Sequence, residues 1–391
     1  MRRNRVILFG CMAASAVLVS FYGGTVTYAL FYTMLIIPVL LWVYLLFVYK
    51  RFRIYQKIDS RVMVKMEQTP YYFHLTNEDF LTFTGVQVTF LEDRSKVEKL
   101  SSNLSYCLLP GEGIERHTTM RAYYRGEYEV GIHQVIVTDF LDIFQLKYRC
   151  PSTIKVYVQP RILSPKQLAI VPEEDDQKRQ NILIAPNPQI PDTEVRNYMS
   201  GDTARMIHWK ASARQQNLMT RKFTEEIKSE IVYLLDLKRP EGDELSVCII
   251  EDKIIETALA VTNYFYRKNT KVSVLWQQEE IRKQIITGKA QFDEWYQFCA
   301  KASFYSTDGV DKLLHKSTSM VSSKARFIIT TACVTKELAK ACYEALAVEL
   351  DVTLVYIGEE SAASIRNKLD ERIHFFQIRL SDEVLSILEG R

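Results

Sequence analysis

The sequence lacks the features that mark several common classes of protein. Its 50 Lys and Arg residues nearly balance 47 Asp and Glu residues, so the formal net charge is only +3 over 391 residues. Such a balance gives the chain no general attraction for nucleic acid. No G-x-G-x-x-G or P-loop lysine motif occurs, so nucleotide binding has no support. We therefore expect no nucleic-acid partner and no cofactor.

The cysteines exclude two further classes. They are scattered, they form no C-x-x-C pair, and their number is odd. This pattern argues against a zinc cluster or a disulfide scaffold and is typical of a reducing compartment. The seven residues are Cys11, Cys107, Cys150, Cys248, Cys299, Cys333 and Cys342.

Charge is missing altogether from residues 6–49, which contain no Asp, Glu, Lys, Arg or His. One helix of this length would measure about 66 Å at about 1.5 Å per residue, whereas the bilayer core is about 30 Å thick. The run therefore predicts two membrane passes, residues 6–22 and 26–49, with a turn at Gly23-Gly24. We expect Pro38 to bend the second pass without ending it.

Basic residues flank this transmembrane hairpin, which we assign to residues 1–57. An excess of Lys and Arg marks the cytoplasmic side, so both termini are predicted to be cytoplasmic. A basic start followed by an apolar run also occurs in signal peptides, but no small-x-small cleavage site follows Val19. In either case the rest of the chain is expected to face the cytoplasm. The flanking residues are Arg2, Arg3, Arg5, Lys50, Arg51, Arg53 and Lys57.

Residues 58–162 predict a β-sandwich, because short β-branched and aromatic segments alternate with Asn, Gly and Pro and show no helical period. About 100 residues of this kind favour an immunoglobulin-like sandwich. Aromatics at 123–128 allow a sugar-binding interpretation, but a glycine-turned hairpin is favoured. The predicted strands are 61–66, 71–75, 81–91, 116–124, 127–137 and 154–159.

Residues 163–228 combine a proline-rich connector, which extends to Asp192, with a basic segment. Asp202 is well placed to cap a helix of about three turns, with Met206, Trp209 and Ala213 as its apolar stripe. Residues 203–223 contain no acid and five basic residues, which are Arg205, Lys210, Arg214, Arg221 and Lys222.

Three interpretations of this basic segment stay open. Its cations can pair with Asp202, Glu225 and Glu226 and hold the helix to neighbouring strands. They can form an exposed patch for an acidic protein partner or an anionic lipid headgroup. His208 can also act as a catalytic base, although no nucleophile lies at a diagnostic spacing.

From residue 229 to 391, apolar strands alternate with helix-length segments. Continuous apolar strands such as 231–235 and 327–330 are typical of a parallel sheet covered on both faces, so we predict a doubly wound α/β domain. Ligands of such domains lie beyond the carboxyl ends of the strands, which directs attention to Asp236. The predicted strands are 231–237, 271–277, 326–331, 352–358 and 375–380; the predicted helices are 249–268, 292–302, 335–350 and 361–371.

Residues 201–214 (Gly-Asp-Thr-Ala-Arg-Met-Ile-His-Trp-Lys-Ala-Ser-Ala-Arg) resemble the signature of the bacterial family called domain of unknown function 58. The similarity extends to residues 125–131, 138–144 and 218–237. The resemblance implies a membrane-anchored protein with a C-terminal domain like that of von Willebrand factor A. It also implies a neighbouring MoxR-type AAA+ ATPase, often a transglutaminase-like membrane protein, and a role in assembly, maturation or stress tolerance at the cell envelope.

The resemblance also points to a degenerate metal site. A domains that hold a divalent metal use Asp-x-Ser-x-Ser after the first strand, because carboxylate and hydroxyl oxygens suit Mg²⁺. Here the position reads Asp236-Leu-Lys-Arg-Pro240, with neither hydroxyl. Residues 307–309 resemble another loop of that site, but residues 327–332, which should carry the third ligand, end in threonines. We expect no metal.

These observations predict a non-enzymatic, cytoplasm-facing adaptor that is anchored in the lipid bilayer and docks a partner such as the AAA+ ATPase. The alternatives are a metal-dependent extracellular adhesin and a hydrolase that uses His208 with Asp236. The predicted partner-binding residues are Arg196, Asp202, Arg205, His208, Trp209, Lys210 and Arg214.

Overall fold

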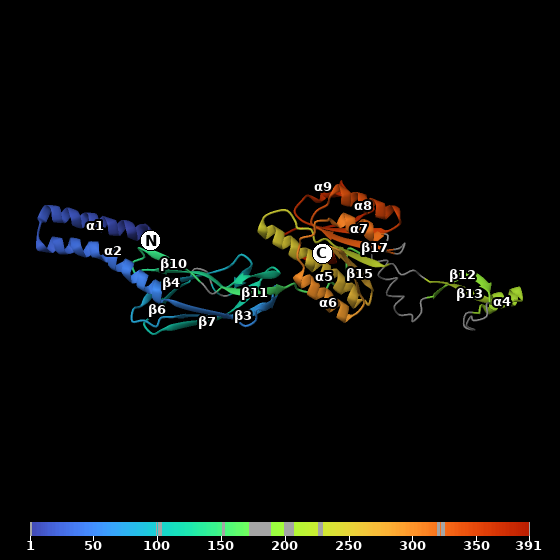
Figure 1. The fold of residues 1–391 in the computed structure, drawn as a ribbon, viewed down its shortest axis with the longest axis horizontal. Helices are drawn as coiled ribbons and strands as arrows, with labels where there is room; N and C mark the ends of the chain where they lie inside the picture. Colours follow the sequence, from blue (N-terminus) through green and yellow to red (C-terminus); the bar gives the residue numbers. More distant parts are fainter. Residues whose placement is uncertain are drawn as a thin grey trace. The chain divides into compact units, whose positions relative to one another are not determined.

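The computed structural model describes residues 2–98, 100, 104–150, 153–171, 189–198, 207–225, 230–318, 321 and 325–390, with backbone only for 189–196 and 221–225. The chain forms two compact units, Met1–Arg161 and Ile162–Arg391. Figure 1 shows the first unit as a helical hairpin with a set of sheets, and the second as an α/β domain with a two-stranded ribbon.

The first unit begins with two helices, α1 (Arg2–Tyr22) and α2 (Thr25–Arg51), which lie side by side (Figure 1). The turn falls at Gly23-Gly24, as predicted, and Gly23 has a φ of 54° that glycine adopts without strain. Pro38 lies inside α2 and does not end it. Both helices are long and apolar enough to cross a membrane.

The last turns of α2 belong to the sheet domain, the name used here for residues 53–161. Leu45, Val48 and Phe52 are buried in the apolar core of that domain. Strand β1 (Arg53–Ile58) starts directly after Phe52 and pairs with β3. The prediction that residues 53–57 are only a basic flank of the hairpin is therefore wrong, because alternate residues of this segment are buried in a sheet.

Three sheets make up the sheet domain, with strand orders β1-β3-β7-β5, β10-β9-β4-β6 and β2-β11-β8. All three contribute to one core, to which Phe73, Val135 and Val156 belong. The remaining strands are β2 (Val62–Val64), β3 (Gln68–Thr76), β4 (Phe83–Phe90), β5 (Ser95–Val97), β6 (Ser105–Leu108), β7 (Gly113–Ala122), β8 (Gly126–Val130), β9 (Ile132–Thr138), β10 (Gln145–Arg149) and β11 (Ile154–Gln159).

Two details of the predicted strands are wrong. Residues 127–137 form two strands rather than one, because the chain turns at Gly131, whose φ is 100°. Strand β8 then pairs with β11, whereas β9 pairs with β4. Residues 123–128 do not form a hairpin either, since β7 and β8 belong to different sheets.

The second unit contains a six-stranded sheet of order β16-β15-β14-β17-β18-β19, in which all pairs are parallel except the edge pair β15–β16. Its strands are β14 (Ile231–Leu235), β15 (Val272–Gln277), β16 (Ile281–Ile286), β17 (Arg326–Thr331), β18 (Asp351–Ile357) and β19 (His374–Ile378). Its helices are α5 (Glu244–Arg267), α6 (Lys289–Lys301), α7 (Val310–Thr318), α8 (Lys336–Ala347), α9 (Ala362–Arg366) and α10 (Val384–Glu389).

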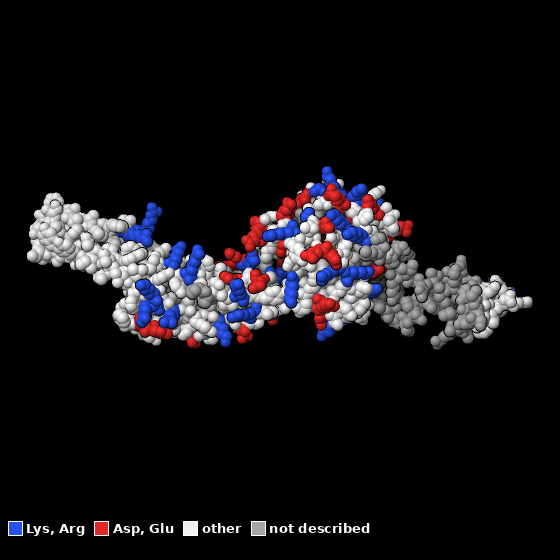
Figure 2. Space-filling model, in the orientation of Figure 1, with Lys and Arg blue, Asp and Glu red and all other residues white. Residues whose placement is uncertain are grey.

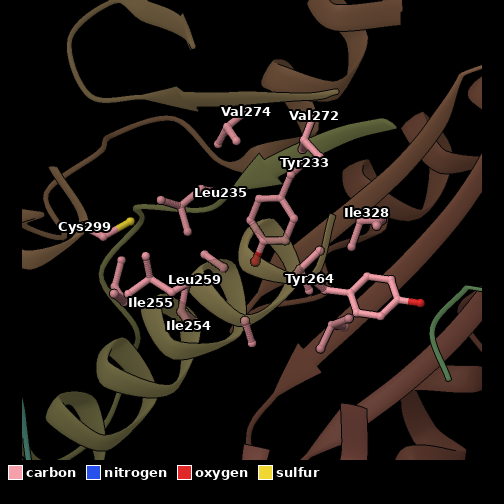
Figure 3. Packing of buried hydrophobic residues seen from close by; sticks show 14 of the residues in the cluster. Tyr233, Leu235, Ile254, Ile255, Leu259, Tyr264, Val272, Val274, Cys299 and Ile328 are labelled. Atoms are coloured by element: carbon pink, nitrogen blue, oxygen red, sulfur yellow. The ribbon is translucent and has the colours of Figure 1, made fainter. Parts of the chain in front are cut away.

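Helices cover both faces of this sheet. Ile231, Tyr233 and Leu235 of β14 share a core with α5, α6 and α10, and Figure 3 shows Tyr233 and Leu235 pointing toward α5. The alternate residues Val232 and Leu234 share a second core with α7, α8 and α9. The domain is therefore doubly wound, as predicted.

The first part of the proline-rich connector lies against this domain. Leu163, Leu168 and Ile170 are buried in the core beside α5 and α10. The side chain of Asn263 on α5 donates a hydrogen bond to the Leu163 carbonyl at 2.8 Å. The connector continues through 172–188, which lie outside the described residues.

Candidate functional site

The central strands β14 and β17 define the topological switch point of the sheet. The chain leaves β14 toward β15 on one side and leaves β17 toward β18 on the other. A crevice at the carboxyl ends of such a strand pair is the usual ligand position in open α/β sheets. Asp236 directly follows β14, and Thr331 is the last residue of β17.

Asp236 is buried, with 6% of its surface exposed, and both carboxylate oxygens have partners within the chain. Thr331 Oγ1 donates to Oδ2 at 2.6 Å, and the Lys238 backbone N–H donates to Oδ1 at 2.9 Å. Burial raises the pKa of the Asp236 carboxyl, and the hydrogen bond from Thr331 acts in the opposite direction. The residue therefore fastens the ends of two strands to each other.

Residues 306–309 lie beside Asp236, because the Ser306 N–H donates to the Leu237 carbonyl at 3.1 Å. The Asp308 carboxylate in this loop accepts a hydrogen bond from Gln277 Nε2 at 2.8 Å and pairs with Lys312. The hydrogen bond from Lys312 lowers the pKa of Asp308. This carboxylate thus forms an ion pair with a lysine of α7.

The residues at this edge do not fit a divalent cation. Such a cation needs several free oxygen ligands, but Thr331 and Lys238 already occupy the Asp236 oxygens and Lys312 pairs with Asp308. In the part of the chain that the structure describes, no three His, Cys, Asp or Glu residues converge as a metal-binding group. The exposed Lys238 further opposes a second positive charge.

The basic segment forms a separate small motif. Strands β12 (Gln189–Asn197) and β13 (Met219–Glu225) pair in antiparallel fashion, and helix α4 (Trp209–Gln215) precedes β13. The Tyr198 N–H donates to the Leu218 carbonyl and the His208 N–H to the Met219 carbonyl, each at 2.8 Å. We call these elements the ββα ribbon.

Helix α4 begins later than predicted. His208 is its N-cap, and His208 Nδ1 accepts a hydrogen bond from the Ala211 N–H at 3.2 Å. Ile207 forms a β-bridge with Thr220, so the chain is still extended one residue before the cap. The prediction of a continuous three-turn helix from Asp202 is therefore wrong, and Asp202 and Arg205 lie outside the described residues.

One side of α4 is fixed to β13. The Met219 N–H donates to Ser212 Oγ at 2.9 Å, and Met219 is buried. The other side is open, because Trp209 is 67% exposed and both Lys210 and Arg214 are exposed. Trp209, which was predicted to belong to the apolar stripe of this helix, is therefore on its solvent side.

The structure brings four predicted residues together on α4 and its cap: His208, Trp209, Lys210 and Arg214. Lys210 and Arg214 are four residues apart and share a helix face. Among the described residues, neither forms an ion pair. The predicted partners Asp202 and Glu226 and the side chain of Glu225 lie outside the described part, so internal pairing stays a prediction.

Two other predicted residues lie outside α4. Arg196 is on β12, where its backbone is in register with Thr220, and its side chain is outside the described part. Asp236 belongs to the sheet edge, not to the ribbon. The sequence did not predict the hydrogen bonds that Ser212 and Thr331 form. The only signal for Thr331 was that the predicted strand ends in threonines.

The fold and these two regions define a class of protein: two helices able to cross a membrane, a domain rich in β-sheet, and a doubly wound α/β domain. The family described as "Protein of unknown function DUF58" matches residues 194–303. This match includes α4 and Asp236, and it supports the family that the signature at 201–214 predicts. No curated protein sequence matches the chain.

Solved structures show only distant likeness. Proximal thread matrix protein 1 from the mussel byssus is 10% identical over 41% of this chain and 46% of its own, with a TM-score of 0.30. The alpha-2-macroglobulin of E. coli is 13% identical over 35% of this chain and 10% of its own, with a TM-score of 0.21. The chain thus spans less than half the length of either protein. Neither likeness bears on function.

Proposed function

We propose that the chain is a membrane-anchored adaptor without enzymatic activity, whose soluble part faces the cytoplasm and docks a MoxR-type AAA+ ATPase. A transglutaminase-like membrane protein is a second expected partner. The process served is assembly, maturation or stress tolerance at the cell envelope. The family match at residues 194–303 and the two apolar helices support this assignment.

The exposed face of α4 is the observation that carries the proposal. Trp and Arg are enriched among the residues that contribute most to protein interfaces. Trp209 presents its ring to solvent, and Lys210 and Arg214 add two cations that have no ion pair in the described chain. An acidic protein surface with an apolar recess complements this combination of groups.

The finer fold assignments belong to the same proposal. Asp236 follows a central strand, at the position where the resemblance to von Willebrand factor A places the first metal ligand. A core shared by three β-sheets, two of which are four-stranded, supports an immunoglobulin-like class for the sheet domain. The unsuitable oxygen set at Asp236 disfavours a metal-dependent adhesin.

A hydrolase receives no support from His208. Its Nδ1 accepts the Ala211 N–H, so this nitrogen caps α4. The polar partners of Asp236 in the described chain are Thr331 and the Lys238 and Thr330 backbones, and His208 is not among them. Catalytic work needs a base within hydrogen-bond reach of a reacting group.

Binding to the purified ATPase tests the docking proposal. The full chain in detergent is immobilised, and Lys210→Glu/Arg214→Glu is compared with Lys336→Glu/Lys340→Glu, an exposed pair with the same spacing on α8. We expect the α4 variant to bind at least about tenfold more weakly, which corresponds to about 1.4 kcal/mol, and the α8 variant to bind normally. Equal binding by both variants and the unaltered chain would falsify the proposal.

Native cysteines test the orientation. Cys11, Cys107 and Cys333 are exposed, and Cys107 lies on β6 of the sheet domain, so it reports the side on which that domain lies. In a Cys11→Ala/Cys333→Ser background, a membrane-impermeant maleimide should label the chain only after cells are permeabilised, and Cys107→Ser should remove that signal. Labelling of Cys107 in intact cells would place the sheet domain outside and support the adhesin alternative.

A further inference from the structure

Two loops at the hairpin end of the sheet domain present large apolar side chains to solvent. We call residues 77–82 and 139–144 the hairpin-side loops. Phe80 is 75% exposed in the first, and Phe140 and Leu141 are 60% and 42% exposed in the second. A cluster of this kind beside apolar helices requires an explanation, because soluble surfaces rarely expose adjacent aromatic and aliphatic side chains.

Hydrogen bonds hold the second loop in this conformation. The buried Asp139 carboxylate accepts the N–H groups of Leu141 at 2.8 Å, Ile143 at 3.2 Å and Phe144 at 2.5 Å. These bonds turn the backbone so that Phe140 and Leu141 stay outside while Ile143 is buried. The exposure of the two residues is therefore built into the fold.

The first loop is fixed in a similar way. The buried Asn77 side chain donates to the carbonyls of Leu81 at 2.8 Å and Leu108 at 3.0 Å. Its oxygen accepts the Asp79 N–H at 3.1 Å. Phe80 stands at the tip of this fixed turn.

Both loops contact the ends of the helical hairpin. Asn4 Nδ2 donates to the Leu141 carbonyl at 2.8 Å, which brings the start of α1 to the second loop. The rings of Tyr44 and Phe140 lie 5.5 Å apart. The rings of Phe47 and Phe80 lie 5.8 Å apart, which brings α2 to the first loop. The loops therefore lie level with the helix ends.

The uncharged part of α1 is slightly shorter than the bilayer core is thick. This part, residues 6–22, is about 26 Å long at about 1.5 Å per residue, and the bilayer core is about 30 Å thick. The last turns of α2 cannot face lipid on every side, because Leu45 and Val48 are buried in the sheet domain. A lipid boundary that covers the whole hairpin therefore reaches the hairpin-side loops.

The charges at this level suit anionic phospholipid. Figure 2 shows the hairpin free of Lys and Arg along its length, with basic side chains where it meets the sheet domain. Arg2, Arg3 and Lys50 are exposed there. Three acids also lie here: Asp79 pairs with Arg51 at 2.8 Å, Glu78 lies 4.0 Å from Arg53, and Asp142 is exposed in the second loop. The exposed basic residues outnumber them, since Arg5, Arg51 and Arg53 add to the three already named. Basic residues beside an apolar surface are typical of contact with anionic headgroups.

We propose that the hairpin-side loops are a lipid-contact surface, which inserts Phe80, Phe140 and Leu141 into the headgroup boundary of the bilayer that the hairpin spans. The inference rests on the membrane anchoring proposed above. Insertion of apolar side chains by about 5–10 Å is typical of interfacial elements. The sheet domain then meets the bilayer directly as well as through α2.

A fluorescent probe tests this surface. The purified full chain carries Cys11→Ala, Cys107→Ser and Cys333→Ser, so that its exposed thiols are removed. An environment-sensitive dye is attached to Phe80→Cys or Leu141→Cys, and the protein is reconstituted into vesicles of phosphatidylethanolamine and phosphatidylglycerol. We expect a blue shift of the emission and its loss when the lipids carry nitroxide quenchers.

Two control positions separate the possible failures. Val62 is exposed on β2, so a dye at Val62→Cys should emit as in water. Val17 is exposed on α1 and should report the bilayer interior. Water-like emission at 80 and 141 with lipid-like emission at 17 would overturn the inference alone. Water-like emission at 17 as well would overturn the membrane anchoring on which it rests.

Discussion

The edge of the α/β sheet and the ββα ribbon use polar side chains in opposite ways. At the edge, the carboxylate oxygens of Asp236 are hydrogen-bonded to Thr331 and to the Lys238 backbone, and Asp308 is paired with Lys312. On α4, Lys210 and Trp209 face solvent. Buried polar groups that are already hydrogen-bonded are closed to a ligand, whereas exposed groups are available for binding. The contrast favours α4, and not the edge of the α/β sheet, as the functional surface.

Removing the hydroxyl at the edge should have the largest effect on stability. Thr331→Val takes away the donor to a buried carboxylate, and such a loss costs about 2 kcal/mol of unfolding free energy. Urea denaturation, followed by the emission of Trp276 and Trp295 in a Trp42→Phe/Trp209→Phe background, measures the change. Thr318→Val, at the exposed end of α7, is the control and should change little. Equal stabilities of the two variants would show that the hydrogen bond from Thr331 to Asp236 does not stabilise the edge of the sheet.

Replacing the carboxylate itself should have a smaller effect of the opposite sign. Burial raises the pKa of Asp236 above its ordinary value of 3.8, so the folded state binds the proton more tightly than the unfolded state. The carboxyl therefore stabilises the fold below pH 3.8, and this contribution is lost as the pH rises through the folded pKa. Asp236→Asn should then be more stable than the unaltered chain at pH 7, because the amide is neutral in the buried site without binding a proton.

The amide fits this position because the Thr331 hydroxyl can turn to donate to the Cys333 carbonyl, which lies 3.0 Å away. The amide group can then donate to Thr331 Oγ1. Urea denaturation at several pH values should show the gain shrinking as the pH falls. A variant that is less stable than the unaltered chain at pH 7 would contradict the assigned direction of the pKa.

The smallest effect on stability is expected on α4. Trp209→Ala removes a ring that is 67% exposed, so the unfolding free energy should change by less than about 0.5 kcal/mol. Circular dichroism during urea denaturation measures this change, and the ATPase-binding assay measures the expected loss of affinity in parallel. A large loss of stability would mean that the ring packs against the fold, which would remove the contrast between the two regions.

The sequence predicted the α/β domain well because its strands are continuous apolar runs. Every residue of 231–235 is buried, because helices cover both faces of the sheet. A continuous apolar run of this length is typical of a central parallel strand. Strand β1 was missed because its charges are compatible with two structures. Arg53 and Lys57 alternate with less exposed residues in a strand, but basic residues after an apolar helix are also typical of a membrane flank. Its pairing with β3 depends on residues far along the chain.

The candidate site was predicted in composition but not in geometry. Local preference favours Asp202 as a cap, yet the bridge between Ile207 and Thr220 holds the chain extended and moves the helix start to Trp209. The bond between Thr331 and Asp236 joins residues 95 positions apart. Such a partner follows only from strand order, which the residue pattern does not specify.

The junction of α2 with the sheet domain has a mechanical consequence. Only Phe52 separates α2 from β1, and Phe52, Leu45 and Val48 are buried in one core. No flexible linker thus lies between α2 and β1, and we expect the hairpin and the sheet domain to move together as one rigid body. A change in the direction of α2 therefore changes the direction of the sheet domain by the same angle.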